Sequence, residues 1–101
     1  MREALRQYEA AYESLDPAAV KRIVPALDVR ELARTFDNYR AYNIEIAISN
    51  IVFEGSGARV VCVVKRTFTP KAGRGASVST QTTFRMQKTG SAWVVVGVDA
   101  R

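Results

Sequence analysis

The chain has 101 residues, of which 48% are hydrophobic and 25% are charged, and its formal net charge is +5. This length and balance are typical of one globular domain with a single core, which argues against a disordered chain or several domains. The sequence has no histidine and one cysteine, which excludes an internal disulfide and argues against zinc, iron–sulfur and histidine-based chemistry. We interpret that residue, Cys62, as a small buried hydrophobic side chain, because valines flank it.

No stretch approaches the roughly 18 to 20 consecutive apolar residues of a membrane span. No apolar segment follows the first residues, so a secretory signal is not visible, and the compartment stays open. The pattern of elements starts at once and stops directly after a strand. We therefore expect residues 1–101 to be one domain that is excised from, or appended to, a larger protein.

Helical periodicity occupies the first 40 residues. The first segment carries one apolar stripe, made of Leu5, Tyr8, Tyr12 and Leu15. Asp16 followed by Pro17 is typical of a new helix start, because aspartate caps free N–H groups and proline fits the first helical position. The second, short helix is predicted to carry Val20, Ile23, Val24 and Leu27 on one side, with Pro25 marking its end. The third begins after Asp28, which stands three residues before Glu31 as in a capping box. Its expected inward face comprises Val29, Leu32, Ala33, Phe36 and Tyr39.

After Arg40 the apolar period changes to two, which is the period of a strand. The apolar parity switches near Ser49 and Asn50, and such a switch predicts a β-bulge that bends the strand. A glycine turn at residues 55–57 leads to a second strand over 58–69. Its middle is apolar on both parities, so we expect it to be covered on both faces. Further strands are predicted over 77–88 and 92–100.

This order of elements predicts an α+β fold, in which three N-terminal helices pack on the concave face of a curved four-stranded antiparallel sheet. A curved sheet that is closed by helices forms a cone. The cone is either filled with side chains or holds a pocket.

Several local patterns point to one family. They are the paired tyrosines Tyr8 and Tyr12, the segment Leu-Asp-Pro-Ala-Ala-Val at 15–20, and a last hairpin in which Phe84 leads through a polar turn to Trp93 and a run of valines. In these features, over nearly its whole length, the chain resembles the nuclear transport factor 2-like superfamily, the cystatin-like or SnoaL-like cone. Only residues 25–28 separate the second and third helices, where fuller members insert a hairpin, so this is a short form. The resemblance implies a domain appended to larger bacterial proteins, some of them signalling proteins, and pairing through the sheet.

A catalytic role would need a carboxylate as the base. The sheet region offers Glu45, Glu54 and Asp99. The alternative function is a small cone-pocket enzyme, similar to an isomerase or dehydratase, with a buried carboxylate of raised pKa beside a tyrosine. Because histidine is absent and these carboxylates stand at polar or terminal positions, we name no catalytic residue. We expect neither a metal nor a cofactor.

Aromatic side chains are expected around the helix–sheet interface. They could line a pocket for a small apolar or anionic ligand, with tyrosine hydroxyls to orient it, or they could simply fill the core. The candidates are Tyr8, Tyr12, Phe36, Tyr39, Tyr42 and Trp93.

Positive charge is concentrated in the sheet half of the chain, since residues 55–98 include seven basic residues and no acidic one. Such a field could attract phosphate, nucleic acid or an acidic protein surface. The basic residues are divided between both faces of the strands and are not interleaved with an aromatic stacking platform. Nucleic acid is therefore not favoured as a partner.

The outward parity of the second and third strands mixes apolar and short polar side chains, which suits packing against another sheet. We expect a homodimer, or docking onto a neighbouring domain, through this face. The predicted contact residues are Val61, Val63, Lys65, Gln81, Thr83 and Arg85. The sequence thus favours a non-catalytic module for ligand binding or protein assembly.

Overall fold

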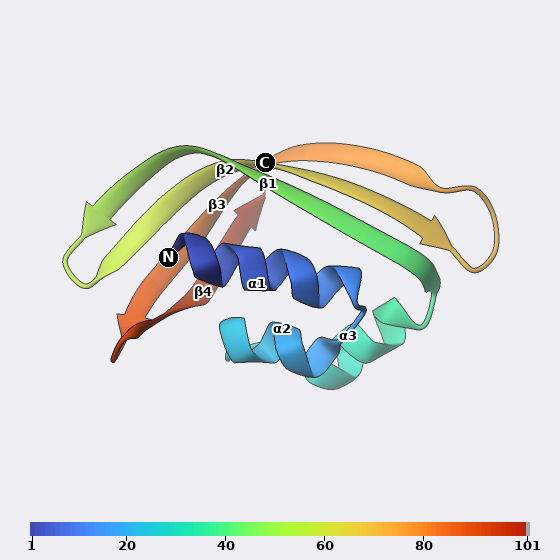
Figure 1. Cartoon of the computed structure of the whole chain (residues 1–101), viewed down its shortest axis with the longest axis horizontal. Coiled ribbons are helices and arrows are strands. Elements are labelled where there is room, and N and C mark those ends of the chain that lie inside the picture. Colours follow the sequence, from blue (N-terminus) through green and yellow to red (C-terminus); the bar gives the residue numbers. More distant parts are fainter. Residues whose placement is uncertain (101) are drawn as a thin grey trace.

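The structure, a computed structural model, describes residues 1–100 and places three helices beneath the concave side of one curved antiparallel sheet (Figure 1). The helices are α1 (Arg2–Glu13), α2 (Pro17–Ile23) and α3 (Val29–Phe36), and the strands are β1 (Tyr39–Glu54), β2 (Gly57–Pro70), β3 (Ala76–Thr89) and β4 (Ala92–Ala100). The strands lie in chain order, so β1 and β4 form the two edges. This architecture confirms the predicted α+β cone. Within residues 1–100, no helix is long and apolar enough to cross a membrane.

Two aspartates cap helices as the sequence predicts. The Asp16 carboxylate accepts a hydrogen bond from the N–H of Ala19 at 3.3 Å. The Asp28 carboxylate accepts from the N–H groups of Arg30 and Glu31 at 3.1 and 3.2 Å. Each cap satisfies donors that have no partner within the first turn of a helix.

Two helices end earlier than predicted. Helix α2 stops at Ile23, because Pro25 disfavours the helical conformation in the residue before it, and Val24 accordingly adopts φ −118° and ψ 83°. Helix α3 stops at Phe36, and Tyr39 is the first residue of β1 instead of part of the helix. The chain therefore turns into the sheet earlier than its apolar periodicity indicates.

The sheet bends where the register slips. A register shift between Ile48 and Asn50 in the β1–β2 pair confirms the predicted bulge, and a second shift lies between Arg85 and Met86 in the β3–β4 pair. Bulges increase the local twist of a strand and bend it. The result is the arched sheet that Figure 1 shows over the helices.

The core lies between the concave face of the sheet and the buried sides of α1 and α2. Leu5 and Tyr8 of α1 and Val20 of α2 are at most 3% exposed. They meet a row of inward side chains from all four strands, each no more than 1% exposed: Ile44, Val60, Cys62, Val64, Phe84 and Val95.

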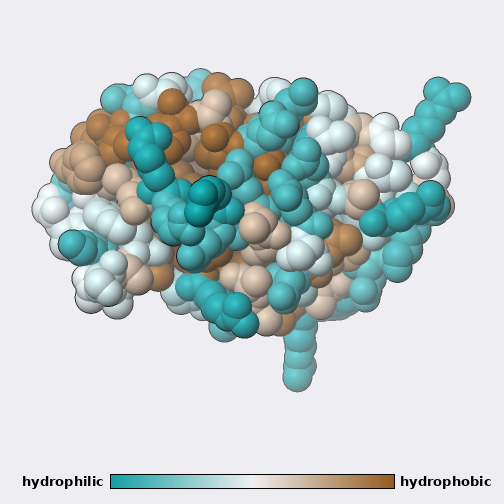
Figure 2. Space-filling model, in the orientation of Figure 1, coloured by the Kyte–Doolittle hydropathy of each residue, from teal (hydrophilic) through white to brown (hydrophobic). Residues whose placement is uncertain are grey.

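The outer face of the sheet is open, and here the expectation that β2 is covered on both faces is wrong for the single chain. Val63 is 46% exposed although its neighbour Val64 is 1% exposed. The physical reason is that all three helices lie on one side of the sheet (Figure 1). Figure 2, in the orientation of Figure 1, shows apolar surface toward the β1–β2 hairpin, where Val52 of the outward parity and Phe53 of the inward parity are both exposed.

The buried thiol of Cys62 predicts a loss of stability at alkaline pH. Cys62 is fully buried, and burial raises the pKa of its thiol to about 11 from 9.0. The unfolded chain releases this proton at a lower pH than the folded chain does. The buried thiol therefore contributes fully to the free energy of unfolding below pH 9, and this contribution is lost as the pH rises toward 11. Urea unfolding from pH 7 to 10.5 should show a steeper alkaline decline for the wild type than for Cys62→Ala. A thiol reagent should label Cys62 only in the unfolded protein, and rapid labelling of the folded chain at pH 8 would contradict this.

Candidate functional site

Five of the six predicted aromatic candidates meet in one cluster around the C-terminal half of α1. Tyr8 and Tyr12 come from α1, Phe36 from α3, and Tyr39 and Tyr42 from β1. Phe68 of β2, which was not among the predicted candidates, contacts Tyr39 and Tyr42. Contacting ring centroids in this aromatic cluster lie 4.8 to 6.4 Å apart.

The rings of the aromatic cluster pack closely against one another. Tyr8 is 3% and Phe36 is 5% exposed. Burial, followed by the neighbouring Tyr8, raises the pKa of Tyr12 above its usual value, so this phenol is neutral at pH 7. Open grooves of about 230 to 250 Å³ lie elsewhere on residues 1–100, and the five aromatic residues line none of these. Tyr8 and Phe36 therefore fill the core, whereas Tyr12, Tyr39 and Tyr42 are only partly buried.

The sixth candidate, Trp93, is not part of this cluster. It lies near the start of α1 and lines an open groove with Met1, Glu3, Ala4 and Gln7. The reason is topological: β4 returns Trp93 to the end of β3 at Lys88, whereas the cluster gathers around the other end of α1.

Arg66 of β2 is a charged residue of this region that was not among the candidates predicted from the sequence. Its guanidinium donates a hydrogen bond from Nη1 to the Tyr42 hydroxyl at 3.0 Å, and its Cζ lies 5.5 Å from the centre of the Tyr12 ring. The alternation of side chains along β2 could have predicted its position, because residue 66 shares the inward parity of Cys62 and Val64.

No carboxylate neutralises Arg66 within the described residues. The ion pairs there join Glu3 to Arg6, Glu54 to Arg59 and Asp99 to Arg85. A half-buried guanidinium that stays charged at every physiological pH is thus held by phenols and an aromatic face alone.

The three sheet carboxylates considered for catalysis are all exposed. The register places Glu45 opposite Lys65, while Glu54 and Asp99 form the ion pairs with Arg59 and Arg85. All three belong to the outward parity of their strands, on the opposite face from the tyrosines. Residues 1–100 also contain no group of three or more side chains suited to hold a metal ion.

Helix α1 closes the β1 edge of the sheet through Glu9. Its carboxylate accepts the backbone N–H of Ile46 at 2.8 Å, across 37 positions of sequence. An edge strand presents free N–H groups that favour pairing with other chains, and a covering side chain removes such a site. Glu9 therefore fixes where α1 lies against the sheet.

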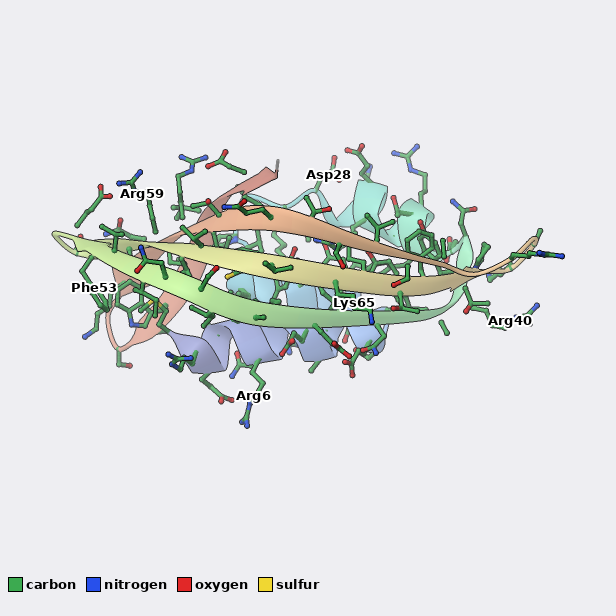
Figure 3. All side chains as sticks on the ribbon, turned by 90° about the horizontal axis from the view of Figure 1, so that it is seen from above. Arg6, Asp28, Arg40, Phe53, Arg59 and Lys65 are labelled. Atoms are coloured by element: carbon green, nitrogen blue, oxygen red, sulfur yellow. The ribbon has the colours of Figure 1, made fainter. Side chains whose placement is uncertain are left out.

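The six predicted contact residues lie together on the outer face. Val61 stands opposite Thr83, and Val63 opposite Gln81, in the β2–β3 register. Val61, Gln81 and Thr83 also line a shallow groove with Val52 and Arg59. Figure 3 views this outer face from above, with Lys65 toward its middle and Arg59 toward the β1–β2 hairpin.

Known proteins share the fold and little of the sequence. No protein-family model and no curated protein matches the chain. Among solved structures, a nuclear transport factor 2-like superfamily protein from Salmonella enterica is 14% identical, with 98% of this chain and 85% of that chain covered and a TM-score of 0.79. A candidate calcium/calmodulin-dependent protein kinase II association domain from Xanthomonas campestris is also 14% identical (98% and 82% covered, TM-score 0.77). A candidate scytalone dehydratase from Novosphingobium aromaticivorans is again 14% identical (99% and 79% covered, TM-score 0.83). The fold of this chain is therefore that of the nuclear transport factor 2-like superfamily.

Proposed function

We propose that this domain is a non-catalytic assembly module that pairs two copies of the chain through the outer face of its sheet. The observation that carries the proposal is the composition of that face. It combines exposed valines at its centre with balanced charge around them, in a chain whose net charge is +5.

The centre of the outer face suits sheet-on-sheet packing. Val63 is 46% exposed and stands beside the uncharged side chains of Val61 and Gln81, while Val52, nearer the β1–β2 hairpin, is 38% exposed and stands opposite Arg59. Two sheets that pack face to face interdigitate such side chains about 10 Å apart. A second copy would cover these valines and would also supply the outer cover that the sequence of β2 predicts.

The charges around this centre suit self-pairing in particular. Glu45, Glu54 and Asp99 balance Arg59, Lys65 and Arg85, so three acidic and three basic side chains share the face. In a two-fold dimer the same patch meets itself, and a patch of one sign would repel its copy. A balanced face within a basic chain avoids that repulsion.

The proposal includes the expectation that the domain is one part of a larger protein, in which pairing would bring two attached domains together. Among its structural neighbours, the candidate association domain from Xanthomonas campestris is named for such a role. The alternative of a cone-pocket enzyme finds less support, because the sheet carboxylates face away from the tyrosines and Arg66 occupies the inward position beside them.

The test uses two valines of nearly equal exposure on opposite faces. Val63, on the outer face, is 46% exposed, and Val78, on the inward parity of β3, is 47% exposed. Val63→Glu places like charges against each other in the dimer and should weaken it about 100-fold or more, since such contacts cost several kcal/mol. Val78→Glu should leave the dimer intact. Sedimentation equilibrium from 5 to 500 µM measures both. A monomeric wild type at the highest concentration, or equal effects of the two variants, would refute the proposal.

A further inference from the structure

We propose that Arg66 and Tyr42 form a binding site for the carboxylate of a small organic acid with an apolar body, on the concave side of the sheet. This inference goes beyond the proposed pairing and does not rest on it, because Arg66 has the inward parity of β2 and the pairing face has the outward one.

The first observation is an unused charge. Arg66 is half-buried and forms no ion pair within residues 1–100. A guanidinium has five N–H donors, whereas its polar neighbours, the phenols of Tyr42 and Tyr8, each offer a single oxygen. A sequestered charge is costly unless it is paired, so an anion would satisfy both the charge and the remaining donors.

The second observation is the orientation of the Tyr42 hydroxyl. Its oxygen accepts a hydrogen bond from Arg66, which leaves its own proton free to donate. The guanidinium and this hydroxyl can therefore donate to the same carboxylate. The ring of Tyr12 beneath the guanidinium, at 5.5 Å, holds the charge in place without neutralising it.

The third observation is access from solvent. Arg66 lies at the border between covered and uncovered parts of the concave face: Val64, two residues earlier on β2, is 1% exposed, while Val78, its register partner on β3, is 47% exposed. Strand β4 pairs with β3 only as far as Thr82, so no described strand flanks residues 76–81 of β3 on that side. A solute can therefore reach the border where Arg66 lies.

These surroundings select the class of ligand. A planar carboxylate matches the fork of a guanidinium, and it carries the single negative charge that one arginine balances. Val78 and the half-buried Phe68 offer apolar contact beside the charge, which suits an aromatic or short aliphatic body. Inorganic phosphate would bring more charge and no apolar group, so we expect it to bind more weakly.

The test uses benzoate as the probe and follows the wild-type protein by two-dimensional NMR. Benzoate should bind with a Kd on the order of 1 mM, and the largest shifts should cluster around Tyr42, Arg66 and Val78. Benzamide, which has the same shape without the charge, and inorganic phosphate should each bind at least about 10-fold more weakly. Equal binding of benzoate and benzamide, stronger binding of phosphate, or shifts centred elsewhere would overturn the proposal.

Three variants refine the test. Arg66→Met should weaken benzoate binding at least about 10-fold, and Tyr42→Phe about 3- to 10-fold, because each removes a donor to the carboxylate. Arg59→Met removes an arginine that is ion-paired to Glu54 on the outer face, and it should not change the Kd. Wild-type affinity in Tyr42→Phe and Arg66→Met would refute the assignment. If Arg66→Met does not fold, Tyr42→Phe and the comparison of benzoate with benzamide still test whether the carboxylate binds at this site.

Discussion

Replacing Phe84 with alanine should cost about 3–5 kcal/mol of the free energy of unfolding, the range for large aromatic residues in protein cores. Phe84 is 0% exposed and stands between Val60 of β2 and Val98 of β4 in the sheet. Its ring meets that of Tyr8 edge to face, with centroids 5.5 Å apart. The substitution would therefore remove the contact that joins the middle of the sheet to α1. For a domain of this size, Tm should fall on the order of 20 °C.

The chain provides a matched control for this prediction. Phe53 is 66% exposed at the β1–β2 hairpin, so Phe53→Ala makes the same chemical change with little loss of buried surface. Its effect should stay within about 1 kcal/mol. Urea unfolding followed by the fluorescence of Trp93 measures both variants. Similar losses from the two substitutions would show that Phe84 is not at the centre of the core.

The architecture could be predicted because its signals are local. The caps at Asp16 and Asp28 depend on hydrogen bonds over two or three residues, and the bulge depends on a parity switch within one strand. Periodicity then separates inward from outward positions, and this also explains why the six contact residues share one face. Such features need no knowledge of what the chain meets later.

The functional environment was less predictable because it depends on partners far apart in sequence. Arg66 meets Tyr42 across 24 positions, and Glu9 meets Ile46 across 37. Arginine and glutamate usually lie on the solvated surface, so the type of residue alone did not indicate these contacts. For Trp93 the residue type predicted a place at the helix–sheet interface. It did not predict that the last hairpin brings Trp93 near the start of α1, away from the other aromatic residues.

The apolar outward positions of β2 predict a covering layer that one copy of the chain does not supply. Val61 and Val63 have the composition of a strand covered on both faces, yet the helices cover one face only. The proposed pairing reconciles these observations, because a second copy would supply the missing layer. The inward residue Arg66 departs from the apolar pattern in the opposite sense, as a charge among core positions. A residue that breaks the pattern of its element in this way is a candidate for function.

Replacing Glu9 with alanine should lower the free energy of unfolding by about 2 kcal/mol, because a hydrogen bond to a charged group contributes about 1.5–3 kcal/mol and its loss leaves a polar group unpaired. The Glu9 carboxylate accepts the N–H of Ile46 at 2.8 Å, at a part-buried site on an edge strand. Glu9→Gln retains an acceptor and should lose about half as much. Glu13→Ala, an exposed change one turn further along α1, should stay within about 0.5 kcal/mol.

Hydrogen exchange at the Ile46 amide gives a local measurement, since this amide should be protected in the wild type and in Glu13→Ala but exchange faster in Glu9→Ala. Unchanged protection in Glu9→Ala would mean that α1 is held to the sheet by apolar packing alone, whereas accelerated exchange at Ile46 would identify this hydrogen bond as the link that closes the β1 edge.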